Sequence, residues 1–182
     1  MRFAARAIPR RFLLMFRIRL LAFACLVCCS VGVAGYGQTM PQTVGTTLSG
    51  KAVTLAQAVR GQRVVLVAGF SRAGGSGTGA WVKAVKADPA LKGVDVWQVA
   101  MLAGAPGFVR GMIRNGMKKG LTAEEQERFV VLAQDEAAWR SYFGVTQDDV
   151  PYVMLLDAAG KVLWRGHGAA AGMEPALRGA AK

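Results

Sequence analysis

The chain reads Val64-Val65-Leu66-Val67-Ala68-Gly69-Phe70-Ser71-Arg72-Ala73-Gly74-Gly75-Ser76-Gly77-Thr78-Gly79-Ala80-Trp81 over residues 64–81, an apolar run that leads into a glycine-rich segment. A continuous run of β-branched and other apolar residues is typical of a strand buried on both faces. The glycines that follow predict a turn, and the residues from Thr78 onward predict a helix. A turn between a buried strand and a helix is where α/β proteins commonly carry their chemistry.

Strands and helices are predicted to alternate through most of the chain. The predicted elements are a short helix near 56–60, a strand over 64–70, a helix over 78–88, a strand over 94–101, a helix over 105–120, a strand over 129–133 and a helix over 135–143. Thr122 and Glu125 match a capping box, and Asp135 is a candidate N-cap. This alternation favours parallel strand pairs joined by right-handed crossovers.

The C-terminal part predicts a β-hairpin that begins with a proline. The strand Val150–Leu156 contains Pro151 near its start, Asp157–Gly160 is a turn, and Lys161–Gly166 returns as the partner strand. A helix over 172–182 follows. We therefore expect an α/β fold with a mixed central sheet, helices inserted between the early strands, and an antiparallel hairpin at the C-terminal end.

The first 37 residues have the composition of a targeting segment. Six arginines and no acid precede an uncharged apolar run from Leu20 to Ala34, which ends at the small residues Gly35 and Gly37. This pattern predicts a signal peptide. The uncharged stretch 20–37 is also close to the ~18 residues of a membrane-spanning helix, so a retained anchor in the inner membrane is the competing interpretation. An arginine-rich mitochondrial transit peptide is a third.

These interpretations divide the chain into three parts. Residues 1–37 are the signal peptide or anchor, residues 38–49 a linker or an early hairpin, and residues 50–182 the folded domain. A signal peptide and an anchor both export the domain, which is then periplasmic or secreted.

All three cysteines, Cys25, Cys28 and Cys29, lie inside the apolar run of the targeting segment. A domain that begins after residue 37 has no thiol, so it cannot be a dithiol oxidoreductase or a thiol peroxidase. Six of the 23 basic residues and none of the 11 acids belong to the targeting segment, so the formal net charge falls from +12 to +6 without it. That mild charge gives no reason to expect nucleic-acid binding. We expect no metal and no cofactor, because no ligand spacing predicts either.

The order of elements and three short motifs resemble the thioredoxin-like fold. The motifs are Phe70-Ser71 after the first central strand, Pro151-Tyr152-Val153 in the hairpin, and the tail Asp157-x-x-Gly160-Lys161-Val162-x-Trp164-Arg165-Gly166-His167-Gly168. Within that superfamily they look most like the assembly-chaperone family for the membrane sector of mitochondrial ATP synthase, over roughly residues 44–176. The resemblance implies a three-layer fold and a cis proline at Pro151. The loop after the first central strand, which carries Cys-x-x-Cys in thioredoxins, has no cysteine here.

The resemblance implies a binding role rather than catalysis. Redox-active thioredoxin-like proteins bind extended peptides between the loop after the first central strand and the proline of the hairpin. By this likeness, the expected partner-binding groove consists of Phe70, Ser71, Arg72, Trp81, Pro151 and Tyr152. We therefore expect an exported, redox-inactive protein that assists the assembly of another exported or membrane protein.

A small serine-dependent hydrolase is the enzyme alternative. Gly69-Phe70-Ser71-Arg72-Ala73 imitates a nucleophile elbow, and Asp157 and His167 follow Ser71 in the order of α/β-hydrolases. Only one short strand region precedes Ser71, whereas a hydrolase sheet has most of its strands before the nucleophile. We expect Ser71 to cap the following helix or turn instead. We also expect His167 to be exposed and the glycines to form a flexible loop, because they fit a dinucleotide fingerprint only loosely.

The predicted helix over 105–120 is a second candidate interaction site. Its apolar face consists of Phe108, Val109, Met112, Ile113 and Met117, and its basic face consists of Arg110, Arg114, Lys118 and Lys119. By default such an apolar face packs on the core. The alternative is contact with a partner helix or with a membrane surface, where the cations meet lipid phosphates.

Overall fold

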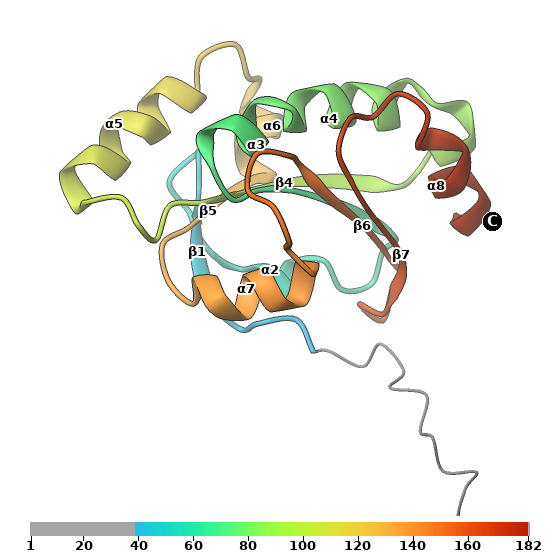
Figure 1. Cartoon of the computed structure of the whole chain (residues 1–182), viewed down its shortest axis with the longest axis horizontal. Helices are drawn as coiled ribbons and strands as arrows, with labels where there is room; N and C mark the ends of the chain where they lie inside the picture. The colour runs from blue at the N-terminus through green and yellow to red at the C-terminus, as the bar shows by residue number, and fades with distance from the viewer. Residues whose placement is uncertain (1–38, 182) are drawn as a thin grey trace, which may run out of the picture. The chain divides into compact units, whose positions relative to one another are not determined.

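The computed structural model describes residues 39–181, which form one seven-stranded sheet flanked by helices (Figure 1). The strands are β1 (Val44–Thr47), β2 (Ala52–Thr54), β3 (Val64–Gly69), β4 (Asp95–Met101), β5 (Phe129–Leu132), β6 (Tyr152–Leu156) and β7 (Val162–His167). The helices are α2 (Leu55–Ala58), α3 (Arg72–Ser76), α4 (Thr78–Ala87), the 3₁₀ turn η1 (Pro89–Leu91), α5 (Gly107–Met117), α6 (Ala123–Glu127), α7 (Glu136–Phe143) and α8 (Glu174–Ala180). The expected targeting segment and its three cysteines lie outside the described residues.

The sheet is mixed, as the sequence predicts. Its strand order is β2-β1-β5-β4-β3-β6-β7. Strands β3, β4 and β5 are parallel, β6 and β7 form the predicted antiparallel hairpin beside β3, and β1 pairs antiparallel with β5. The carboxyl ends of the three parallel strands therefore meet at one end of the sheet, which is where open α/β sheets bind ligands.

Helices cover both faces of the sheet, so the domain has three layers (Figure 1). Helices α4 and α8 pack on one face, and α2 and α7 on the other. Because successive side chains of a strand point to opposite faces, Leu66 packs in the cluster of Trp139, whereas Val65 and Val67 pack in the cluster of Trp81. Every residue of β3 is buried, which confirms the prediction of a strand buried on both faces.

The segment 38–49 contains a strand and is more than a linker. β1 forms a hairpin with β2 and also pairs with β5 in the main sheet. The β-branched residues Thr46 and Thr47 stand opposite Val131 and Val130, a pairing that suits strand residues. Residues 44–47 therefore belong to the sheet and pair with residues 52–54 as a hairpin.

Asp135 stands before α7 as predicted, but its side chain does not cap the helix. Its backbone is left-handed, with φ 55°, and its carboxylate accepts a hydrogen bond of 2.6 Å from the Thr43 hydroxyl. The carboxylate thus ties the N-terminal segment to the start of α7. Among residues 39–181, no helix has the length and apolar character needed to cross a bilayer.

Candidate functional site

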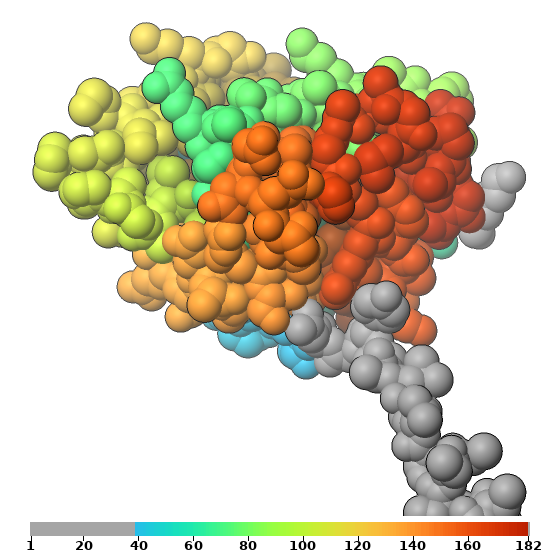
Figure 2. All heavy atoms as spheres, viewed as in Figure 1, coloured from blue at the N-terminus to red at the C-terminus, as the bar shows by residue number. Residues whose placement is uncertain are grey.

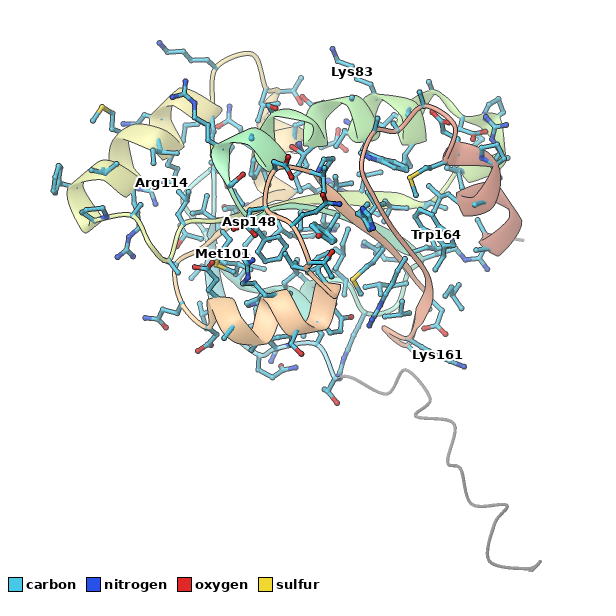
Figure 3. All side chains as sticks on the ribbon, viewed as in Figure 1. Lys83, Met101, Arg114, Asp148, Lys161 and Trp164 are labelled. Atoms are coloured by element: carbon cyan, nitrogen blue, oxygen red, sulfur yellow. The ribbon has the colours of Figure 1, made fainter. Side chains whose placement is uncertain are left out.

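Ser71 begins the helix after β3 and is engaged as its N-cap. Its hydroxyl accepts a hydrogen bond of 3.0 Å from the Gly74 backbone N–H and donates one of 2.6 Å to the Asp148 backbone carbonyl. Figure 3 shows Asp148 next to this turn. The cap satisfies an amide at the helix N-terminus, which helps a glycine-rich segment to become helical. The predicted capping role is confirmed, and the expected flexible loop is instead the helix α3.

The side of α3 that faces Pro151 is closed by backbone packing. A Cβ on Gly74 would lie 2.7 Å from the carbonyl oxygen of Asp148 and 2.8 Å from that of Val150. A Cβ on Gly77 would lie 3.0 Å from Pro151 Cγ. The two segments approach this closely only because glycine has no side chain, and they leave no space for a peptide between them. The peptide bond before Pro151 is trans, unlike the cis proline that the resemblance implies.

Three residues of the expected partner-binding groove belong to the core instead. Trp81 is fully buried, and its indole N–H donates to the Gly168 carbonyl at 2.8 Å. Pro151 is buried, and Tyr152 is 2% exposed. These three side chains pack within the domain instead of lining a groove: Trp81 lies in the cluster of Val65 and Val67, Tyr152 in the cluster of Leu66, and Pro151 against Gly77.

The Tyr152 hydroxyl holds the loop that closes this side. It accepts hydrogen bonds from the backbone N–H groups of Thr146 and Gln147, at 2.9 and 3.0 Å, and donates one to the Gln147 carbonyl at 2.9 Å. The Tyr152 ring also meets the Phe70 ring edge-on, with a centroid distance of 5.9 Å. The loop of residues 146–148 is thereby fixed against the core next to Ser71.

Phe70, Ser71 and Arg72 face an open cleft on the other side of α3. The cleft has a volume of about 860 Å³ and lies at the carboxyl ends of β3 and β4. α3 and the start of α4 form one wall, α5 forms the other, and β4 forms the floor. Most of the other lining residues are apolar or small, including Val99, Ala100, Met101, Leu102, Ile113, Met117 and Phe129. The charged lining residues are Arg72, Lys119 and Glu136. An apolar cleft of this size with few polar groups is typical of a binding site.

Glycines on both walls keep this cleft open. Gly75 and Gly79 lie on the α3–α4 wall, Gly104 in the loop after β4, and Gly116 on α5. Nothing lies within 4 Å of the position that a Cβ would take at any of them, and none has a positive φ. Neither backbone conformation nor packing within the domain therefore requires glycine at these positions. The glycine cluster is visible in the sequence, but no local pattern separates the packed Gly74 and Gly77 from the open Gly75 and Gly79, because the difference depends on residues 148–151.

Helix α5 is the predicted interaction helix, and none of its residues is buried. The Phe108 side chain is 81% exposed and Met112 is 68% exposed. Met117, at the other end, packs on the small cluster that contains Leu48 and Phe129. The default expectation of core packing is therefore wrong for the first half of the helix. Its physical reason is that α5 runs past the ends of the strands and forms an edge of the domain (Figures 1 and 2).

The chain around α5 is strongly basic. Residues 96–123 contain no Asp or Glu but include Arg110, Arg114, Lys118 and Lys119. Arg114 is labelled on α5 in Figure 3. Within residues 39–181 no carboxylate pairs with any of the four cations, and Arg110 donates to the Ala105 carbonyl at 2.7 Å instead. The segment therefore has an uncompensated positive charge.

The residues of the hydrolase alternative are not assembled into a triad. Ala68 stands opposite Tyr152 and Val64 opposite Leu156, so Asp157 lies at the far end of β6 from Ser71, about 16 Å along the strand. Its carboxylate accepts hydrogen bonds from the backbone N–H groups of Ala159 and Lys161 and so caps the hairpin turn.

His167 is exposed, as expected, and its ring packs on Tyr152 with a centroid distance of 5.4 Å. Across the part of the chain that the structure describes, no cluster of His, Cys, Asp and Glu is suited to holding a metal ion.

Solved structures with a thioredoxin-like fold are similar to this chain. One is a putative thiol:disulfide interchange protein DsbE from Chlorobium tepidum, with a TM-score of 0.53 and 20% identity over 80% of this chain and 97% of that one. Another is the exposed lipoprotein thioredoxin Etrx1 from Streptococcus pneumoniae strain TIGR4, with a TM-score of 0.52 and 16% identity over 77% of this chain and 98% of that one. A third is BsSco, a member of the Sco family of cytochrome c oxidase assembly proteins, with a TM-score of 0.51 and 12% identity over 79% and 91%.

These structural likenesses establish the thioredoxin-like fold. No curated protein matches the chain in sequence. The model of one protein family, described as ATP10 protein, matches residues 34–177, which is most of the chain and the whole of the sheet. The chain belongs to the ATP10 protein family.

Proposed function

We propose that this protein is a non-catalytic assembly factor that binds a protein partner in the cleft between α3, α4 and α5. The open cleft of about 860 Å³, next to a helix with no buried residue, is the observation that carries the proposal. If α5 served only the stability of the domain, Phe108 and Met112 would be buried, because apolar side chains stabilise a fold only when they are removed from water. Neighbouring apolar side chains that stay exposed instead mark an interaction surface. Membership of the ATP10 protein family supports an assembly role.

The chemistry of the cleft supports binding without catalysis. The position after β3, where thioredoxins carry their dithiol, has Ser71 in place of a thiol, and no cysteine follows residue 29. The Ser71 hydroxyl is committed to Gly74 and Asp148, and no histidine or carboxylate is hydrogen-bonded to it as a base within the described residues. The cleft thus presents shape and charge to a partner but no activated nucleophile.

The partner that we propose is a membrane-sector component of ATP synthase. The name of the family refers to ATP synthase, and the resemblance of the Phe70-Ser71 and Pro151-Tyr152-Val153 motifs points to the same assembly chaperones. The structural neighbour BsSco belongs to a family of assembly proteins for another membrane complex, cytochrome c oxidase. We further propose that residues 1–37 export the domain, as a signal peptide or as an anchor, so that it meets its partner at the outer face of the membrane.

A deletion strain tests the assembly role. Membranes from cells that lack the protein are solubilised mildly and separated on native gels, and assembled ATP synthase is quantified beside the respiratory complexes. We expect less assembled ATP synthase, restored by the wild type and by Leu163→Ser, which changes an exposed apolar residue of β7 away from the cleft. The double variant Phe108→Ser, Met112→Ser should fail to restore it. Normal amounts of ATP synthase in the deletion strain would show that the proposal is wrong.

The export proposal has its own measurement. Mass spectrometry of the protein from fractionated cells gives its N-terminal peptide and its compartment. A mature N-terminus near residue 38 supports a cleaved signal peptide, and an intact N-terminus in the membrane fraction supports an anchor. Recovery of the full chain from the cytosol would contradict both.

A further inference from the structure

We infer that the cleft binds an amphipathic helix of the partner whose apolar face is flanked by acidic residues. This inference rests on the proposed function and specifies the chemistry of the partner segment. Three properties of the cleft support it: its walls are helices, its floor is a strand with no free edge, and its unpaired charges are positive.

The geometry of the cleft favours a helix over an extended peptide. Its walls are helices, α3 with α4 on one side and α5 on the other. Its floor is the end of β4, which pairs with β3 on one side and β5 on the other, so it has no free edge to which a strand could be added. A groove between helices takes a helix by its apolar face, through residues one turn apart.

The open glycines suit the close approach of another helix. Gly75 and Gly79 stand on one wall and Gly116 on the other, each with open space where a side chain would lie. Small residues on helix surfaces let a second backbone approach closely. Beyond the cleft, the exposed Phe108 and Met112, one turn apart on α5, extend its apolar wall along the helix. The occupant that covers both is elongated, which argues against a compact small molecule.

The charge of the cleft selects an acidic helix. Arg72 and Lys119 are exposed and lie on opposite walls. The one acidic lining residue, Glu136, is already paired with Arg140 at 3.5 Å. The other three cations of the α5 segment, which pair with no carboxylate of residues 39–181, add a field of the same sign that attracts acidic partners and repels basic ones. Two acidic edges on a helix of the partner would meet the two basic walls.

The same charge argues against two other occupants. The chain's own residues 1–37 carry six arginines and no acid, so the cleft repels them. A bilayer surface attracts cations but is flat, and it cannot fill a cleft recessed between two helical walls. A partner helix satisfies the charge, the shape and the exposed apolar residues together.

Binding of model peptides tests the inference. The probes are fluorescein-labelled helical peptides of about 18 residues, long enough to be helical in isolation. One has a leucine face flanked by glutamates, the second replaces each glutamate by lysine, and the third keeps the glutamates but replaces each leucine by serine. Fluorescence anisotropy measures their binding to the purified full chain, in the form to which cells process it. The acidic leucine peptide should bind at least about tenfold more tightly than the other two, with an affinity that falls as salt is raised.

A matched pair of glycine variants assigns the binding to the cleft. Gly79→Leu should weaken the acidic peptide at least about tenfold by filling the space that the helix needs. Gly179→Leu, at an exposed glycine of α8 with nothing within 4 Å, is the matched control and should bind as the wild type does. Both variants should be at least as stable as the wild type, because leucine favours a helix over glycine. The charge reversal Arg72→Glu, Lys119→Glu should make the lysine peptide the preferred one.

Several results would overturn the inference. Equal binding of the lysine and glutamate peptides would show that charge does not select the partner helix. Equal binding of the acidic peptide to Gly79→Leu and Gly179→Leu would show that the cleft is not the binding site. Binding to vesicles of anionic phospholipid, with no binding to any peptide, would assign the surface to a membrane instead. The proposed function fails separately: a deletion strain with normal ATP synthase contradicts that function even when the peptide binds. A defective strain with no peptide binding contradicts only the inference.

Discussion

The two sides of α3 differ although they are built from the same run of glycines. On the side of Pro151, a Cβ at Gly74 or Gly77 would lie within 3.0 Å of other atoms of the chain. On the side of α5, a Cβ at Gly75 or Gly79 would meet nothing within 4 Å. Glycine allows close packing on the first side and leaves the cleft empty on the second.

This difference corrects what the resemblance to redox-active thioredoxin-like proteins implies. The resemblance implies that a peptide binds between the loop after β3 and Pro151. That position is filled here by the backbone of residues 148–151. The open cleft lies on the other side of the same turn, where α5 provides an apolar and basic wall. A thioredoxin-like domain can thus keep its fold while a different side of the turn after β3 is open.

Alanine at two adjacent positions of α3 gives the largest contrast between the sides. Gly74→Ala should destabilise the domain by about 2–3 kcal/mol, because its Cβ collides with backbone oxygens that cannot move independently. Gly75→Ala should be neutral or stabilise by up to about 1 kcal/mol, as alanine does for glycine in an open helix. Urea unfolding followed by circular dichroism measures both. Equal effects of the two substitutions would contradict the division into a closed and an open side.

The closed side also depends on the Tyr152 hydroxyl. Tyr152→Phe should cost about 2 kcal/mol, because two backbone N–H groups of the 146–148 loop lose their acceptor. The matched substitution is Tyr142→Phe, because the buried Tyr142 hydroxyl has no hydrogen-bond partner among the described residues. That change should be neutral or stabilise by about 1 kcal/mol. A comparable loss in both variants would show that the hydrogen bonds of Tyr152 do not hold the loop.

The buried hydroxyl of Tyr142 should also make the stability of the domain depend on pH. Burial raises the pKa of Tyr142 from its ordinary 10.0 to about 12. The neutral hydroxyl is therefore preferred in the folded state, and its contribution to stability is complete below pH 10 and is lost as the pH rises toward 12. Tyr142→Phe should remove this alkaline loss, which unfolding midpoints measured between pH 9 and pH 11 would show as a flatter curve. An unchanged alkaline slope would mean that Tyr142 titrates as an exposed phenol does.

The central strands were predicted from the sequence because local patterns of apolar and turn residues determine where they form. The run Val64–Ala68 and the Pro151 hairpin predicted β3, β6 and β7, since burial on both faces and turn residues leave few alternatives. α3 was missed because glycine is a poor helix former, and its helix depends on the Ser71 cap and on packing against a segment more than 70 residues away. Thr43 and Asp135, 92 residues apart, likewise give no local sign of their hydrogen bond.

The site was predicted only in part, for a similar reason. Phe70, Ser71 and Arg72 were placed at the right turn, but which side of the turn is open depends on the path of residues 148–151. Helical periodicity identified the apolar residues of α5, yet it does not say whether that face meets the core. The position of α5 past the strand ends decides this, and it leaves Phe108 and Met112 uncovered.

Removal of the Ser71 hydroxyl should have a smaller effect than the changes on the closed side. Ser71→Ala should cost about 1 kcal/mol, the usual loss for a helix N-cap. The variant should behave as the wild type does toward a fluorophosphonate probe, with no labelling of either, because Ser71 has no base beside it. Urea unfolding and in-gel fluorescence measure the two effects. Labelling of the wild type that disappears in Ser71→Ala would restore the hydrolase alternative.

Substitutions of exposed residues on the open side should change the free energy of unfolding least of all. The double variant Phe108→Ser, Met112→Ser should change the free energy of unfolding by no more than about 0.5 kcal/mol, because both side chains are already exposed to water in the folded state. Met117→Ser, at the partly buried end of the same helix, is the control, and it should cost more because Met117 packs on Phe129 and its neighbours. A large loss in the double variant would mean that α5 is stabilised by its exposed face, and that this face is structural. A small loss, with failure to restore ATP synthase in the deletion strain, would leave recognition of a partner as the role of these two residues.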